Sequence, residues 1–172
     1  WPASMKAFFK SDGSAYQPGE TLAQPDLAAS LKLIAEQGAK AFYEGGIAQK
    51  LVADMQANQG LITLDDLKQY RAVIRAPARG TYRGYDIVSM PPPSSGGVHL
   101  IQILNILETW PLSEGGHNSA ATIHRLAEAM KLAYADRSEY LGDPDFVKVP
   151  VTGLTSKAYA RELAARIDPN RA

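Results

Sequence analysis

The nine residues Met90-Pro-Pro-Pro-Ser-Ser-Gly-Gly-Val98 mark the point at which a strand gives way to a helix. Each proline lacks a backbone N–H and holds φ at about −65°, so a strand that precedes this stretch must end here. Ser94 and Ser95 can accept hydrogen bonds from the first free N–H groups of a helix. Gly96 and Gly97 allow the backbone to approach closely whatever lies against the start of that helix. We therefore predict a strand before this stretch and a helix after it.

The helix predicted after this junction is apolar around most of its circumference. A helix of this kind is buried on most sides, so we predict that it is the central helix of the fold. Its polar interruptions recur every third residue and form a narrow stripe, whose side chains need hydrogen-bond partners once they are buried. The apolar residues are Val98, Leu100, Ile101, Ile103, Leu104, Ile106 and Leu107, and the polar stripe consists of His99, Gln102 and Asn105.

The residues before the junction are typical of a β-hairpin. Residues 77–82 and 85–90 are predicted to be extended, and Val73-Ile74 as well. Arg83-Gly84 lies between the two longer segments and offers a two-residue turn.

Helices are predicted on both sides of this hairpin. The first twenty residues are polar and rich in turn formers, and we expect little regular structure there. Residues 118–141 carry a long helix capped by Asn118 or Ser119, with Gly142 placed to end it. Extended backbone is expected over residues 146–151. The remaining predicted helices are residues 25–37, 39–43, 47–57, 64–70 with a capping box of Thr63 and Asp66, and 156–167.

These elements predict an α+β fold that is rich in helices and contains one hairpin. A chain of 172 residues can bury roughly 70% of the surface that it exposes when unfolded, which is enough for a stable core. The 18 basic and 18 acidic residues give a net charge of zero, so no nucleic acid or anionic membrane partner is expected. There is no cysteine, which excludes disulfides, thiolate metal sites and a cysteine nucleophile. No apolar run approaches the roughly 20 residues of a membrane span.

Several catalytic arrangements can be drawn from the sequence, and each lacks part of its motif. Ser95, His124 and Asp136 could form a serine hydrolase triad, but no Gly-x-Ser-x-Gly elbow surrounds either junction serine. Capping serines and a solvated or core histidine explain these residues better. Thr122 is predicted to lie inside a helix, where it has no free α-amine to act as its base.

The sequence signals for metal, phosphate and acid–base sites are equally weak. The histidines at 99, 117 and 124 lack the spacing of a helical zinc pair, and no cofactor is expected. Ser94-Ser-Gly-Gly97 could hold an anion at a helix start, but no complete phosphate-loop motif is present. We interpret Asp136, Arg137 and Asp143 as structural residues that form ion pairs or capping contacts.

Five longer segments carry a resemblance to a known family. The sequence closely resembles bacterial γ-glutamyltransferase, also called γ-glutamyltranspeptidase, over nearly all of its length. The matching segments are Leu61-Ile-Thr-Leu-Asp-Asp-Leu67, Tyr82-Arg-Gly-Tyr85, Ser89-Met-Pro-Pro-Pro-Ser-Ser-Gly-Gly97, Ile103-Leu-Asn-Ile-Leu-Glu108 and Tyr134-Ala-Asp-Arg-Ser-Glu-Tyr-Leu-Gly-Asp-Pro-Asp-Phe146.

The resemblance implies an N-terminal-nucleophile hydrolase, made as a precursor that cuts itself into a large and a small subunit. The two subunits would fold together as an αββα sandwich, and residues 1–172 would be one helix-rich fragment, the C-terminal half of the large subunit. The parent enzyme would cleave γ-glutamyl amides such as glutathione and transfer the γ-glutamyl group to water or an amino acid. The expected location of the parent is periplasmic or secreted.

The same resemblance places the family's catalytic groups outside this sequence. The nucleophile begins the small subunit in a Thr-Thr-His-x-Ser motif, which is absent here. The arginine for the substrate α-carboxylate belongs to the earlier half of the large subunit, and the oxyanion hole belongs to the small subunit. We therefore predict no catalytic, substrate-binding, cofactor-binding or metal-binding residue in the chain. The expected partners are the rest of the large subunit and the small subunit.

Two further interpretations stay open. The chain could be an independent helical interaction module without catalysis, or a hydrolase that is complete in itself. An independent module is expected to begin and end in exposed linkers, whereas Trp1 and Ala172 resemble cuts in continuing structure. A complete hydrolase would be expected to cleave γ-glutamyl-p-nitroanilide unaided.

Overall fold

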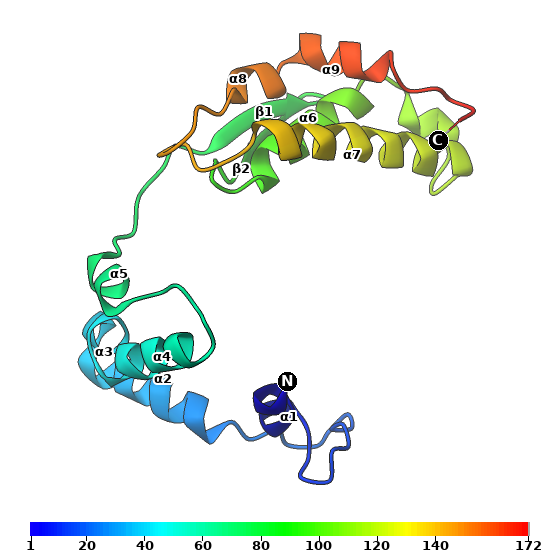
Figure 1. Ribbon diagram of the computed structural model, residues 1–172. Coiled ribbons are helices and arrows are strands. Elements are labelled where there is room, and N and C mark those ends of the chain that lie inside the picture. Colours follow the sequence, from blue (N-terminus) through cyan, green and yellow to red (C-terminus); the bar gives the residue numbers. More distant parts are fainter. Residues whose placement is uncertain (172) are drawn as a thin grey trace. The chain divides into compact units, whose positions relative to one another are not determined.

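A computed structural model describes residues 1–171 of the chain (Figure 1). These residues form two compact units, the first from Trp1 to Val73 and the second beginning at Ile74. Each unit has a core of its own, so each is described separately.

The first unit is entirely helical among its regular elements. Its core is formed by Ala48, Val52 and Leu67, with Tyr43 and Leu51 packed against them. Its helices are α1 (Pro2–Phe8), α2 (Pro25–Gln37), α3 (Ala39–Tyr43), α4 (Gly46–Ala57) and α5 (Leu64–Gln69).

The capping box at the start of α5 is confirmed. The Thr63 hydroxyl accepts a hydrogen bond from the Asp66 N–H at 3.2 Å, and the Asp66 carboxylate accepts one from the Thr63 N–H at 2.8 Å. The Thr63 hydroxyl also donates to the Asp66 carboxylate at 2.7 Å, and this hydrogen bond, followed by that of the Thr63 N–H, lowers the pKa of Asp66. The predicted helices at 25–37, 39–43, 47–57 and 64–70 agree with α2 to α5 within a residue or so.

The expectation of little regular structure in residues 1–20 is wrong. Helix α1 occupies Pro2–Phe8, with proline in its first turn. Proline suits that position because its missing N–H would have no intrahelical partner there. The turn formers that suggested a loop begin only at Ser11, and the first of them lie between Phe9 and Ala15, which form an isolated bridge.

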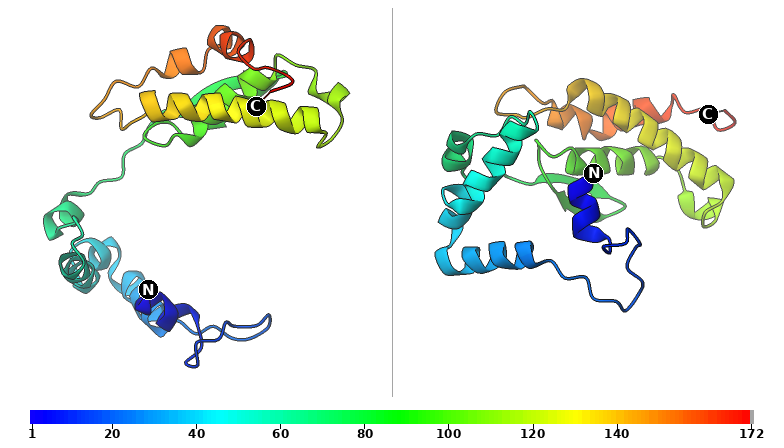
Figure 2. Two further views of the ribbon diagram at one scale, coloured as in Figure 1. Left: turned by 45° about the vertical axis from the view of Figure 1, so that its right-hand side comes forward. Right: turned by 60° about the horizontal axis from the view of Figure 1, so that its bottom comes forward.

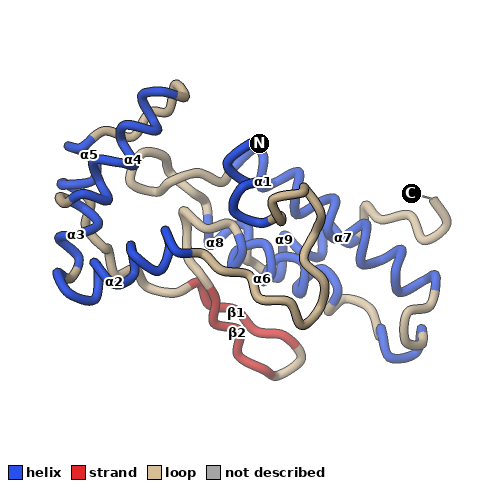
Figure 3. Tube along the Cα trace, turned by 90° about the horizontal axis from the view of Figure 1, so that it is seen from below, coloured by secondary structure: helices blue, strands red, loops and turns tan. Residues whose placement is uncertain are grey.

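The second unit is built around α6 (Gly96–Leu107), which contacts both the hairpin and the helices that follow it (Figures 1 and 3). The views of Figure 2 show the same order, with α6 between the hairpin and α7. The core contains Ile106, Leu107, Ala129, Ala160 and Leu163. The remaining elements are β1 (Ala78–Tyr82), β2 (Tyr85–Ser89), the 3₁₀ helix η1 (Leu112–Gly115), α7 (Ala120–Tyr140), α8 (Val151–Leu154) and α9 (Lys157–Ala164).

The predicted hairpin is confirmed. Strands β1 and β2 are antiparallel, with Tyr82 opposite Tyr85 and Ala78 opposite Ser89. Arg83 and Gly84 form the turn with φ values of 49° and 85°. Two positive φ values in a two-residue loop are typical of the type I′ turn, whose twist matches that of the strands.

Two expectations near the C-terminal end are wrong. Residues 146–151 form no strand: the N–H groups of Phe146 and Val147 both bond to the Asp143 carbonyl in a turn, and α8 begins at Val151. The last helix is shorter than expected and ends at Ala164 rather than Ile167. Among the described residues, no helix combines the length and the apolar character needed to span a membrane.

Candidate functional site

The Pro-Ser-Gly junction brings β2 and the start of α6 into close contact. A Cβ atom on Gly97 would lie 2.1 Å from the Met90 carbonyl oxygen, so only glycine fits there. A Cβ on Gly96 would meet nothing nearer than the Ser94 hydroxyl at 3.5 Å. The predicted close backbone approach is therefore confirmed at Gly97, whereas Gly96 has room for a side chain.

The two junction serines have different partners. The Ser94 hydroxyl accepts a hydrogen bond from the Gly96 N–H at 3.3 Å, as expected for a serine at a helix start. Ser95 is the N-cap residue by position, but its side chain does not cap the helix. It accepts a hydrogen bond from Nε of Arg137 on α7 at 3.1 Å. The expectation that Ser95 caps α6 is wrong, because a residue distant in sequence takes its hydroxyl.

A hollow of about 240 Å³ lies between the junction and the end of α7. Arg137 provides its positive charge, and no salt bridge of the described residues involves this guanidinium. The hollow offers hydrogen-bond donors to an acidic group, but it contains no nucleophile paired with a base. It is lined by Pro93, Ser95, Arg137, Ser138, Leu141 and Gly142.

The polar stripe of α6 is buried, as the apolar residues around the rest of the helix predicted. His99, Gln102 and Asn105 are only 5%, 0% and 2% exposed. His99 Nδ1 lies 2.6 Å from the Ser95 carbonyl oxygen, and because a carbonyl only accepts, Nδ1 carries the proton. Asn105 donates its amide to the Thr155 carbonyl at 2.8 Å.

The stripe joins a buried carboxylate on α7. Asp136 is 9% exposed and accepts hydrogen bonds from the Gln102 amide and from the Tyr159 hydroxyl of α9. Burial raises the pKa of Tyr159 to about 12, and its hydrogen bond to the Asp136 carboxylate adds to that rise. Asp136 thus joins α6, α7 and α9 through two neutral donors, and not through the ion pair or capping contact that the sequence suggested.

The sequence singled out Asp136 but missed Tyr159. Nothing in the spacing of residues 136 and 159 indicates that they meet, because the chain turns back between α7 and α9. The one available signal for this contact was that Tyr159 is a polar residue in the last amphipathic helix.

The structure does not bring the triad residues into mutual contact. Ser95 bonds to Arg137, Asp136 bonds to Gln102 and Tyr159, and His124 Nε2 lies 2.8 Å from the Asp168 carbonyl oxygen. The Thr122 N–H, in the first turn of α7, donates to the capping hydroxyl of Ser119, as the helical position predicted.

The other residues singled out in the sequence have local roles. Asp143 accepts a hydrogen bond from the Asp145 N–H at 3.0 Å within its turn, and His117 lies beside the Asn118 amide. Among residues 1–171, no three potential His, Asp or Glu ligands gather in a metal-binding group. That this chain contributes no catalytic residue stays a prediction.

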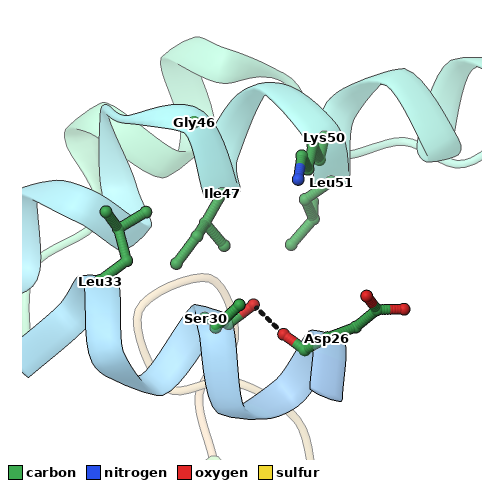
Figure 4. A pocket seen from close by; sticks show the side chains of 8 residues that line it. Asp26, Ser30, Leu33, Gly46, Ile47, Lys50 and Leu51 are labelled. Carbon is green, nitrogen blue, oxygen red and sulfur yellow. Dashed lines mark hydrogen bonds between the residues drawn. The ribbon is translucent and has the colours of Figure 1, made fainter. Parts of the chain in front are cut away.

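A larger hollow of about 590 Å³ lies in the first unit, between α2 and α4 (Figure 4). Leu33, Ile47 and Leu51 point into it, with Asp26 and Lys50 nearby. The Ser30 hydroxyl is occupied by its own helix, because it donates to the Asp26 carbonyl at 3.0 Å. This wall of aliphatic side chains offers apolar contact area and no reactive group.

The γ-glutamyltranspeptidase family profile matches residues 1–172. The glutathione hydrolase proenzyme of Escherichia coli strain K12 is 56% identical over 98% of this chain and 29% of its own length. The acylase ACY 1 proenzyme of Pseudomonas sp. strain SE83 is 49% identical over 98% of this chain and 30% of its own length.

A solved structure of the same family also matches the fold of this chain. The crystal structure of Helicobacter pylori γ-glutamyltranspeptidase matches with a TM-score of 0.86 and 49% identity, over 100% of this chain and 49% of that one. The chain thus spans about three-tenths of the length of the curated relatives that it matches. A profile match along the whole sequence, supported by the same fold at high identity, shows that the chain belongs to the γ-glutamyltranspeptidase family.

Proposed function

We propose that this chain is part of the large subunit of a γ-glutamyltransferase or glutathione hydrolase. The observation that carries the proposal is the 56% identity to a glutathione hydrolase proenzyme over 98% of the chain. The whole enzyme would attack the carbonyl of a γ-glutamyl amide with the hydroxyl of an N-terminal threonine. That attack would release the amine and form a γ-glutamyl ester, which water or an amino acid would then cleave.

In this proposal the nucleophile lies outside the 172 residues. Thr122 supports that view, because it is inside a helix and its N–H is bonded to Ser119. The chain would act as a scaffold, forming part of an αββα sandwich with the rest of the large subunit and the small subunit. The junction at residues 91–97 would lie near the active-site side, because Gly97 permits close backbone approach. The parent protein would be periplasmic or secreted.

The test compares the purified chain with the whole precursor that contains it. Both are assayed for release of p-nitroaniline from γ-glutamyl-p-nitroanilide. We expect release by the matured precursor and none above background by the 172-residue chain. Turnover by the chain alone would overturn the scaffold role and support a hydrolase complete in itself. If the precursor is also inactive, an independent interaction module would explain the chain better than a role in this enzyme.

Acylase activity is a second candidate. It is favoured by the 49% identity to an acylase proenzyme and by the match to cephalosporin acylase from Bacillus halodurans, with a TM-score of 0.80 and 31% identity. The same precursor is therefore assayed with a cephalosporin that carries an acyl side chain. Faster turnover of that substrate than of the γ-glutamyl anilide would favour the acylase.

A further inference from the structure

Helix α7 carries two different apolar faces. On the packed face Ala129 and Ala133 are fully buried, and Leu132 packs against the core. Four other large apolar residues of the helix are 40% to 54% exposed, although the ring of one of them, Tyr134, lies 5.9 Å from that of His99 on α6. They are Ile123, Leu126, Met130 and Tyr134.

These four residues form one continuous stripe. Their spacings of three and four residues place them within about 80° of one another around an ideal helix, along roughly three turns. In Figure 1, α7 lies in front of α6, and no other element of its unit crosses it. The structure packs the neighbouring Ala129 and Ala133 in the core and leaves these four side chains partly exposed.

Arg137 extends this stripe by one turn. Its Nε donates to Ser95, while no carboxylate of the described residues pairs with its guanidinium. We call Ile123, Leu126, Met130, Tyr134 and Arg137 the outer stripe of α7. The outer stripe is therefore apolar along most of its length and carries one positive charge at its C-terminal end.

We propose that the outer stripe of α7 docks the polypeptide of the same precursor that lies outside these 172 residues. This inference rests on the proposed function, since it names the surface through which the scaffold contacts its partner. The docked segment presents an apolar face to α7 and a carboxylate to Arg137.

Two observations select this occupant. The relatives extend far beyond the matched region, because the chain covers only 29% and 30% of their lengths. A second copy of the chain fits less well. The outer stripe contains no carboxylate, so two copies packed through it would leave both Arg137 side chains unpaired.

Cysteine labelling in the whole, matured precursor tests whether the outer stripe is covered. The chain has no cysteine of its own, so Leu126→Cys reports on the stripe. Ala135→Cys is the matched control, because Ala135 is exposed on the same helix but lies well outside the stripe. A thiol reagent is added under native conditions, and the modified peptide is quantified by mass spectrometry.

We expect the thiol at position 126 to react at least about tenfold more slowly than the thiol at position 135, because a docked segment must open before the reagent can enter. In urea the two rates should become similar. Equal rates under native conditions would overturn the inference.

Cross-linking then identifies the occupant. A photoreactive group is attached to the position 126 thiol of unfolded precursor, which is refolded and irradiated. Cross-links to precursor peptides outside the 172 residues support the proposal. Cross-links to a second copy, distinguished by mixing isotope-labelled and unlabelled protein, or to residues 1–73 of the same chain overturn it. Activity measured on the same preparations separates the two proposals, since an active enzyme with an accessible stripe refutes only the docking surface.

Discussion

Gly96 and Gly97 are neighbours in sequence, yet packing requires glycine at only one of them. The Met90 carbonyl oxygen would lie 2.1 Å from a Cβ on Gly97, which is backbone that cannot rotate away. The sequence indicated a close approach at this pair. It could not say which glycine makes it, because that depends on how β2 returns past the start of α6.

We predict that Gly97→Ala destabilises the chain by about 3 kcal/mol, since the clash with backbone forces α6 away from β2. Gly96→Ala is the matched control, because its Cβ meets only the Ser94 hydroxyl at 3.5 Å. The control should change the free energy of unfolding by no more than about 1 kcal/mol. Urea denaturation followed by circular dichroism measures both. If the two substitutions lower the free energy of unfolding equally, the clash with the Met90 carbonyl is not the cause of the destabilisation.

Tyr159 gives the second unit a dependence on alkaline pH. Its pKa is about 12 in the folded chain against an ordinary value of 10.0. The neutral phenol is thus favoured in the fold, so its contribution is complete below pH 10 and is lost as the pH rises towards 12. The loss is on the order of 1 kcal/mol, because partial exposure of Tyr159 reduces it.

The variant Tyr159→Phe tests this pH dependence, because phenylalanine keeps the aromatic ring and has no hydroxyl that can ionise. The free energy of unfolding is measured at pH 9 and pH 11 for both proteins. The original chain should lose more stability than the variant over this interval. If the two lose the same amount, the interaction of Tyr159 with Asp136 does not persist in solution.

At the scale of elements, one glutamate joins the hairpin to α6 and α9. Glu108 accepts hydrogen bonds from the Arg83 N–H in the turn and from the Lys157 ammonium group. Lys157 also donates to the Thr81 carbonyl at 2.7 Å. The N–H of Arg83, followed by Lys157, lowers the pKa of Glu108.

We predict that Glu108→Gln lowers the free energy of unfolding at pH 7 by about 1 kcal/mol, since it keeps the shape but loses two charge-assisted hydrogen bonds. A lowered folded pKa gives stabilisation that is present above the ordinary value of 4.5 and is lost as the pH falls through the folded value. The difference between the two proteins should therefore shrink towards acid pH. Denaturation in urea at pH 7 and at acid pH, with Glu139→Gln on the exposed side of α7 as the control, measures it.

Elements whose signals are local could be predicted from the sequence, and those set by distant contacts could not. The Thr63–Asp66 capping box and the Arg83-Gly84 turn are complete within four residues, so their chemistry determined α5 and the hairpin. Residues 146–151 were predicted to be extended because their apolar side chains suit a strand, but among residues 1–171 the only sheet is the hairpin, and it does not include them. The roles of Ser95 and Asp136 depend on α7 and α9, which local sequence patterns do not reveal.

At the scale of the whole molecule, the segment between the two units has no regular secondary structure. Helix α5 ends at Gln69 and β1 begins at Ala78, and most residues between them are exposed. Arg75, which belongs to the second unit, is the exception, because its guanidinium forms two hydrogen bonds with the Asp145 carboxylate of the same unit, at 3.0 and 2.5 Å.

This arrangement predicts the course of limited proteolysis. Trypsin should cut after Arg71 before it cuts after Arg75, because binding of the Arg75 side chain by the protease requires its release from Asp145. The cut after Arg71 should give one fragment ending at Arg71 and one beginning at Ala72, identified by intact mass. Asp145→Asn should speed the cut after Arg75 and leave the cut after Arg71 unchanged. Lys148 provides an internal control, since it is exposed and lies outside regular structure. Protection of Arg71 under conditions that cleave after Lys148 would show that the segment between the units is covered in solution.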